Sequence, residues 1–228
     1  MSQPQPEQPR TPAHTTGGSG LVVPYGEAGP LPVLALYEDF RCPYCAALEE
    51  AAGPEFRRFA DEGRLRLEYH FAAFLDGMLG GSGSLTALGA AGAAVNVGQR
   101  EFKTLHEALY AQQPDESVDS YREPAVLLRV AESVGLTAPA FREAVQAATY
   151  IPWAAAVAEA FGRSGVRGTP TLRLGGVSIH GFDRAGRPLR APAVAAQLEA
   201  ALEEAPAERS QELRAAREPG AGGPPPSR

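Results

Sequence analysis

Residues 40–45 read FRCPYC, and this stretch holds both cysteines of the chain, Cys42 and Cys45. Two thiols three positions apart allow four interpretations: a catalytic disulfide, half of a zinc site, a structural cross-link, or two ordinary buried side chains. The residues around the stretch and the composition of the chain decide between them.

The length and charge of the chain argue against several functions. Its 228 residues suffice for one sizeable domain with its own core, so a cross-link over so short a loop would add little stability. A formal net charge of −6 without a stripe of Lys and Arg argues against a nucleic-acid partner. No apolar run approaches the roughly 18 residues that cross a bilayer. We therefore expect neither a nucleic-acid nor a membrane partner.

The first residues bear on the compartment. Residues 1–20 lack the apolar centre of a secretory signal, so we expect a cytoplasmic protein. In that compartment a CxxC pair is more often redox-active or metal-binding than structural. Residues 1–20 and 205–228 are rich in polar residues, Pro and Gly, and we expect both to be disordered tails.

The order of the predicted elements indicates an α/β domain over residues 21–204. Short apolar runs predict strands at 21–23 and 32–40, the latter leading directly into the cysteines, and apolar positions three to four apart predict a helix over 46–63. Strict alternation predicts a strand at 64–71. Residues from about 76 to 163 read as helices, and two strands joined by Gly175-Gly176 and a last helix follow. The predicted order is β-β-α-β, a helical insertion, then β-β-α.

A CxxC motif that begins a helix directly after a buried strand has a specific chemistry. Unpaired N–H groups and the positive end of the helix dipole meet at Cys42 and favour its thiolate over its thiol. Pro43 suits the first helical turn, where its missing N–H costs nothing. Cys45 lies one turn further inside, so we expect it to be more buried and suited to resolve a mixed disulfide.

The zinc interpretation needs two more ligands, and the sequence does not supply them in a recognisable pattern. There is no third cysteine, and the histidines His14, His70, His106 and His180 are scattered. We therefore expect no metal and no cofactor. Glu38 and Asp39 lie close to the motif and could assist proton transfer, but exposed acids at the end of a strand are the favoured interpretation, and we assign neither a catalytic role.

A second motif, GVRGTPTL at residues 165–172, begins a predicted strand with Thr169-Pro170. Together with LYEDFRCPYC at residues 36–45 and the helical block between them, it resembles the DsbA-like thiol–disulfide oxidoreductases of the thioredoxin superfamily, over about residues 21–205. The resemblance implies a thioredoxin-like fold with a four- or five-stranded sheet. It also implies Cys42 as attacking thiol, Cys45 as resolving thiol, and a cis Pro170 facing them. Substrate would then contact Pro43, Tyr44, Thr169 and Pro170.

Two positions depart from that pattern. Tyr44 stands where the best-known members carry His, and it supplies no cationic partner, so we expect a less depressed Cys42 pKa and a less oxidising couple. Leu36 stands six positions before Cys42, where the superfamily often has an acid. The predicted function is disulfide exchange by a monomer with protein or low-molecular-weight thiols. The alternatives are a non-catalytic binding module, or an isomerase or transferase that uses a thiol cofactor.

Overall fold

The computed structural model describes residues 10–215, with side chains up to Glu204. Its elements, in chain order, are β1 (Val23–Tyr25), β2 (Val33–Glu38), α1 (Pro43–Asp61), β3 (Arg66–Phe71), α2 (Phe74–Leu79), α3 (Gly83–Val97), α4 (Gln99–Ala111), the 3₁₀ turn η1 (Ser120–Arg122), α5 (Pro124–Ser133), α6 (Pro139–Gln146), α7 (Ile151–Arg163), β4 (Thr171–Leu174), β5 (Val177–Ile179) and α8 (Ala191–Ala215). This is the mixed α/β fold that the sequence predicts.

The strands form one five-stranded sheet in the order β1-β3-β2-β4-β5. β2 and β3 are parallel, which requires the crossover that α1 provides, and the other pairs are antiparallel. The hairpin between β4 and β5 turns at Gly175 and Gly176, whose φ angles of 58° and 93° lie in the region that favours glycine. β2 is therefore the central strand, and it leads straight to Cys42.

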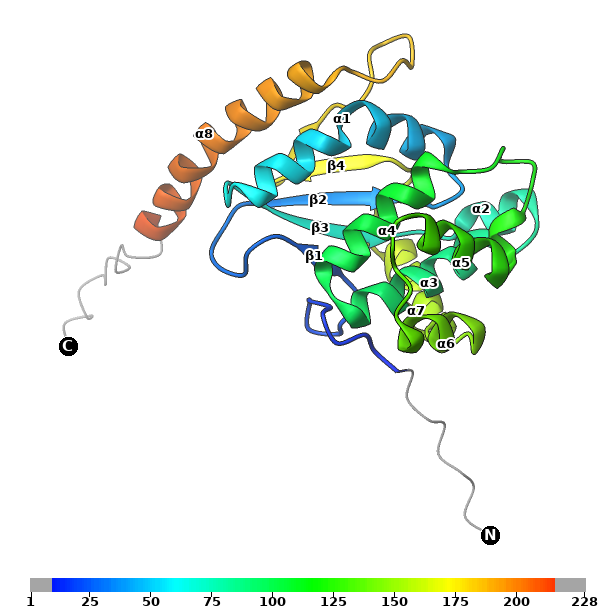
Figure 1. The fold of residues 1–228 in the computed structure, drawn as a ribbon. Helices are drawn as coiled ribbons and strands as arrows, with labels where there is room; N and C mark the ends of the chain where they lie inside the picture. Colours follow the sequence, from blue (N-terminus) through cyan, green and yellow to red (C-terminus); the bar gives the residue numbers. More distant parts are fainter. Residues whose placement is uncertain (1–9, 216–228) are drawn as a thin grey trace, which may run out of the picture.

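The main core lies between one face of the sheet and the helices α1, α4 and α8. Alternate residues of β2 and β3 point into it, among them Leu36, which pairs in register with Tyr69 on one side and Leu172 on the other. Figure 1 shows α1 and α8 along one face of the sheet, and the helices α2–α7 gathered at the end where β2 finishes. The large buried side chains include Phe40, Phe56, Tyr69, Phe71, Phe102 and Trp153.

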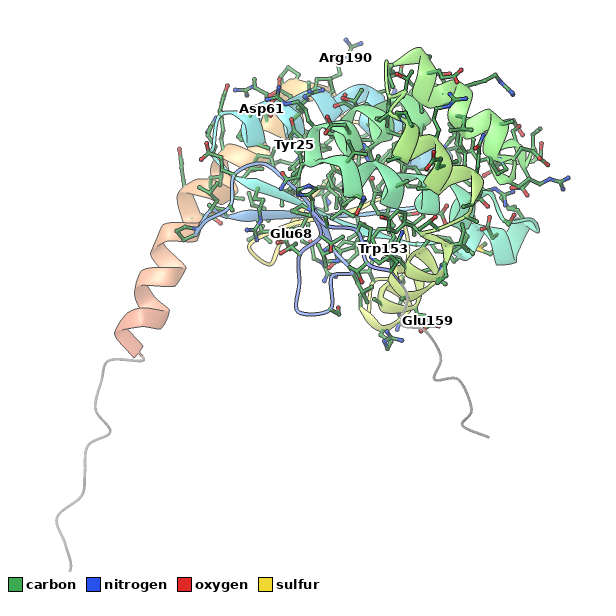
Figure 2. The ribbon with its side chains drawn as sticks, turned by 60° about the horizontal axis from the view of Figure 1, so that its bottom comes forward. Tyr25, Asp61, Glu68, Trp153, Glu159 and Arg190 are labelled. Atoms are coloured by element: carbon green, nitrogen blue, oxygen red, sulfur yellow. The ribbon has the colours of Figure 1, made fainter. Side chains whose placement is uncertain are left out.

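Both ends of the domain differ from the predicted tails. Residues 10–20 are ordered, because Thr16 bridges to Val22, and the Trp153 indole on α7 donates to the Gly20 carbonyl at 2.9 Å (Figure 2). At the other end α8 continues to Ala215, since the Ala-, Glu- and Leu-rich residues after 204 favour helix. The remaining predicted tail residues, 1–9 and 216–228, lie outside the described residues.

Arg41, the neighbour of Cys42, connects the helical insertion to the loop that carries Cys42. Its side chain is only 4% exposed, and its guanidinium donates to Asp76 at 2.9 Å, to the Gly80 carbonyl at 2.8 Å and to the Glu116 carbonyl at 3.1 Å. Asp76 in turn accepts from backbone N–H groups at the start of α3, those of Ser84 and Leu85. The buried Arg41 side chain thus binds α2, the loop that follows α2 and the loop that follows α4.

Replacing this cation is expected to weaken the fold. Arg41→Met should lower the free energy of unfolding by roughly 3 kcal/mol, because it leaves Asp76 without its buried charge partner. Urea titration measures the change. The exposed Arg122, which pairs with Glu123, is the control, and Arg122→Met should cost at most about 1 kcal/mol. Equal, small losses of unfolding free energy in both variants would contradict the proposed contribution of Arg41 to stability.

Candidate active site

Cys42 caps the N-terminus of α1. Pro43 is the first residue of the helix, and the N–H groups of Cys45 and Ala46 donate to the Cys42 carbonyl at 3.1 and 3.2 Å. From the insertion, the Gln113 amide donates to the carbonyls of Phe40 and Cys42 at 2.9 and 3.1 Å. The motif is thus held in a fixed turn at the positive end of a long helix.

The Cys42 thiol is the more acidic of the two. A hydrogen bond from the Cys45 thiol lowers the pKa of Cys42 to about 7, and contacts with Thr169 and with backbone N–H groups of the first turn act in the same direction against burial. The Cys42 sulfur lies 3.4 Å from the Thr169 carbonyl oxygen. A large fraction of Cys42 is therefore thiolate at neutral pH.

Cys45 has the opposite character. It is fully buried, and burial, followed by the hydrogen bond that it donates to Cys42, raises its pKa well above that of an ordinary thiol. Both cysteines are free in the structure. The pair therefore offers one nucleophile and one thiol that needs a base before it can react.

This difference predicts an order of alkylation. Iodoacetamide should label Cys42 first, and its rate should rise with pH around a midpoint near 7, because deprotonation produces the reactive thiolate. Cys45 should be labelled much more slowly at every pH up to 8.5. Mass spectrometry of peptides from the reduced protein, alkylated for short times, measures both rates. Equal rates would contradict the assignment, and faster labelling of Cys45 would reverse it.

The remaining residues expected from the sequence lie around this turn. The Thr169–Pro170 peptide bond is cis, and Thr169 faces Cys42 through its carbonyl. Pro170 lines a groove of about 310 Å³ that also includes Leu48 and Phe182. Tyr44 is 57% exposed and packs edge-to-face against Phe182, with ring centres 5.7 Å apart. The structure therefore brings both cysteines, Pro43, Tyr44, Thr169 and Pro170 to one site.

Behind the cysteines lies a buried charged cluster of Glu38, Glu49, Lys103 and His106. The His106 Nε2 atom lies 2.7 Å from a carboxylate oxygen of Glu38, and the Lys103 ammonium lies 3.2 Å from Glu49 and 3.5 Å from His106 Nδ1. All four side chains are at most 3% exposed. Glu38 ends β2, Glu49 is on α1, and Lys103 and His106 come from α4 of the insertion.

Burial sets the protonation of this cluster. It raises the pKa of Glu38 to about 7 against the opposing effect of Lys103, and it raises the pKa of Glu49. It lowers the pKa of His106 to about 3, with Lys103 acting in the same direction, so that the imidazole is neutral. Glu38 is close enough to Cys45 to raise its pKa further. The cluster thus places a carboxylate that titrates near neutrality beside the buried thiol.

The interpretation of Glu38 and Asp39 as exposed acids is wrong. Glu38 is 1% exposed and Asp39 is fully buried, accepting from the Ser84 hydroxyl at 2.6 Å and from the backbone N–H groups of Arg41 and Leu75. The sequence does not reveal this because the insertion, which is distant along the chain, covers both residues. Glu38 lies on the same strand face as Leu36, two positions nearer to Cys42.

The sequence does not single out Lys103 and His106 as members of a site. The signal that could have found them is their position on α4, next to the apolar Phe102, Leu105 and Leu109 in a helix whose inner face they share. Donor atoms of Glu38, Glu49 and His106 lie within 4.8 Å of one another, which is a spacing that suits a metal ion. The Lys103 ammonium lies in the same cluster and supplies a positive charge to these groups.

Comparisons with known proteins agree with this fold. The profile of a family described as Thioredoxin matches residues 20–191. A thiol-disulfide oxidoreductase of Actinomyces oris, MdbA, is 22% identical, with a TM-score of 0.62 over 74% of this chain and 83% of its own. DsbA of Mycobacterium tuberculosis is 23% identical, with a TM-score of 0.60 over 82% and 96%, and BdbD of Bacillus subtilis is 18% identical, with a TM-score of 0.65 over 85% and 100%. Comparison with curated protein sequences gives no match.

Proposed function

The chain belongs to the thioredoxin family, and we propose that it is a DsbA-like thiol–disulfide oxidoreductase that exchanges its Cys42–Cys45 pair with thiols and disulfides of other molecules. The observation that carries the proposal is the asymmetry of the two cysteines. One thiol has a pKa of about 7 at a helix N-terminus, and its partner is buried one turn below with a raised pKa. Disulfide exchange needs this division between an attacking and a resolving thiol.

The exchange proceeds in two balanced steps. The Cys42 thiolate attacks one sulfur of a substrate disulfide, the S–S bond breaks, and the other substrate sulfur leaves as a thiolate. Cys45 then loses its proton and attacks the Cys42 sulfur of the mixed disulfide. The second substrate thiolate leaves, and the protein holds a Cys42–Cys45 disulfide. The same steps in reverse order oxidise a substrate dithiol.

Glu38 is the group in the cluster best suited to accept the Cys45 proton. Its carboxylate has a pKa near 7, and no other described carboxylate affects the Cys45 pKa as strongly. Because the Lys103 ammonium can only donate to Nδ1 of the neutral His106, the tautomer with the proton on Nε2 donates to Glu38 and stabilises its carboxylate once it is charged. Glu38 thus assists the second step, in which the less acidic thiol must react.

Substrate is proposed to bind where the sequence motifs meet. An extended peptide would pair with the backbone of Thr169, beside Pro170, and would contact Pro43 and the exposed ring of Tyr44. The groove of Leu48, Pro170 and Phe182 next to Tyr44 is apolar at these positions and suits a non-polar side chain near the substrate cysteine. A cytoplasmic location and a monomeric state stay predictions. None of the helices in the described part of the chain is long and apolar enough to span a membrane.

Turnover of a protein disulfide with dithiothreitol as reductant tests this function. Catalysis well above the uncatalysed rate, abolished in Cys42→Ser, is the expected result. A protein that only binds thiols or peptides would give no turnover. A thiol-cofactor-dependent transferase would turn over only with a cofactor adduct, which a parallel reaction with glutathione adducts detects.

A further inference from the structure

A second groove, of about 730 Å³, runs between α1 and α4 and shares no lining residue with the groove at Pro170. It begins at Pro43, the residue next to Cys42, and continues along α1 past Glu50 to Pro54. Glu107 and Tyr110 of α4 form its other wall. A polypeptide joined to Cys42 can therefore enter this groove directly at its end.

The charges in the groove are not balanced. Glu107 pairs with Arg57 at 2.9 Å, and Glu49 pairs with Lys103 at 3.2 Å. Glu50 is exposed and makes no ion pair with any described residue. The groove therefore keeps one uncompensated carboxylate, Glu50, within its walls.

Pro54 leaves a further acceptor on the same wall. Pro54 has no N–H, so the Glu50 carbonyl loses its usual helical donor while α1 continues through the proline. Proline inside a helix costs stability, and here it stands one turn after the exposed carboxylate of Glu50.

We propose that this groove binds a basic side chain, Lys or Arg, of the polypeptide whose cysteine is exchanged at Cys42. The positive charge would lie against the Glu50 carboxylate and carbonyl. Glu50 is seven residues after Pro43, about 10 Å along a helix, and about three residues of extended chain cover this distance. The preferred clients therefore carry a basic residue about three positions from the reactive cysteine. This inference names a substrate class and rests on the proposed function.

Short peptides test the preference. Each has blocked termini and one cysteine held as a mixed disulfide with 5-thio-2-nitrobenzoate, and carries Lys, Gln or Glu three residues before or after the cysteine. Attack by Cys42 releases the chromophore and leaves the peptide attached at the groove. We expect the Lys peptide of one series to react roughly two- to fivefold faster than the Gln peptide at low salt, and the Glu peptide to react more slowly. The difference should shrink as salt is added.

Two variants and a matched control test whether Glu50 in this groove causes the preference. Glu50→Gln should remove the preference, and Glu50→Lys should reverse it. Glu203→Gln on α8 changes the net charge equally, is exposed and lies outside the groove, and it should keep the preference. Equal rates for all peptides, or a preference that survives in Glu50→Gln, overturns the inference. The Gln peptide reports exchange itself, so its failure to react would count against the proposed function instead.

Discussion

Replacing Cys45 with serine is expected to leave the substrate attached to Cys42 as a stable mixed disulfide. The first attack needs only the Cys42 thiolate, whereas release of the second substrate thiolate needs the resolving thiol that the variant lacks. Steady-state turnover should fall by roughly three orders of magnitude or more, as it does when a nucleophile is removed. Non-reducing electrophoresis and mass spectrometry of the trapped species measure the effect.

Cys42→Ser is the matched comparison. It should lose turnover to the same extent but trap far less substrate, because the remaining Cys45 is fully buried and has a raised pKa. Equal trapping by both variants would contradict the division of roles. If trapping occurred only in Cys42→Ser, the chain would remain an oxidoreductase with the two roles exchanged.

Replacing Glu38 with glutamine should slow the resolution of the mixed disulfide by roughly 10²-fold, the lower end of what a positioned base contributes. In the wild-type protein this rate should rise with pH around a midpoint near 7, because the Glu38 carboxylate must lose its own proton before it can accept that of Cys45. The variant should lose this midpoint. Rapid mixing with a chromogenic mixed disulfide, at several pH values, separates resolution from the first attack.

The pH dependence of the unfolding free energy is a second test of the raised pKa of Glu38. Folding raises its pKa from an ordinary value near 4.3 to about 7, so the folded protein holds this proton more tightly than the unfolded chain. The contribution to stability is complete below pH 4.3 and is lost as pH rises to about 7, on the order of 4 kcal/mol. Glu38→Gln should not show this loss. Glu68→Gln, on the other face of the sheet, is the control, and it should change neither the resolution rate nor this pH profile.

The parts of the site that are close together in the sequence could be predicted. The strand, the CxxC turn and the helix are contiguous, so the N-terminal position of Cys42 and the burial of Cys45 follow from helix geometry alone. Thr169 and Pro170 are distant along the chain. They could be added because their motif is recognisable and begins a strand.

The charged cluster could not be predicted in the same way. Its members come from β2, α1 and α4, and only Lys103 and His106, three positions apart on α4, have a sequence spacing that indicates contact. The sequence around Glu38 is typical of a solvated acid, because it does not show that α4 covers this residue. The sequence around Lys103 is typical of an ordinary cation on a helix. The prediction that residues 10–20 are disordered is wrong for a similar reason, because these residues contact Trp153 and Asn96 of the insertion. Local sequence patterns therefore do not predict which polar residues are buried by distant segments.

The most direct test of the account is the equilibrium between the Cys42–Cys45 pair and redox buffers of known potential. The fraction of reduced protein is measured by alkylation and mass spectrometry across dithiothreitol and glutathione buffers. We expect one two-electron transition, in which both thiols disappear together, with a midpoint between roughly −270 and −120 mV, the range of disulfide exchange proteins. A pair that stays reduced, or stays oxidised, across that whole range would contradict a role in disulfide exchange.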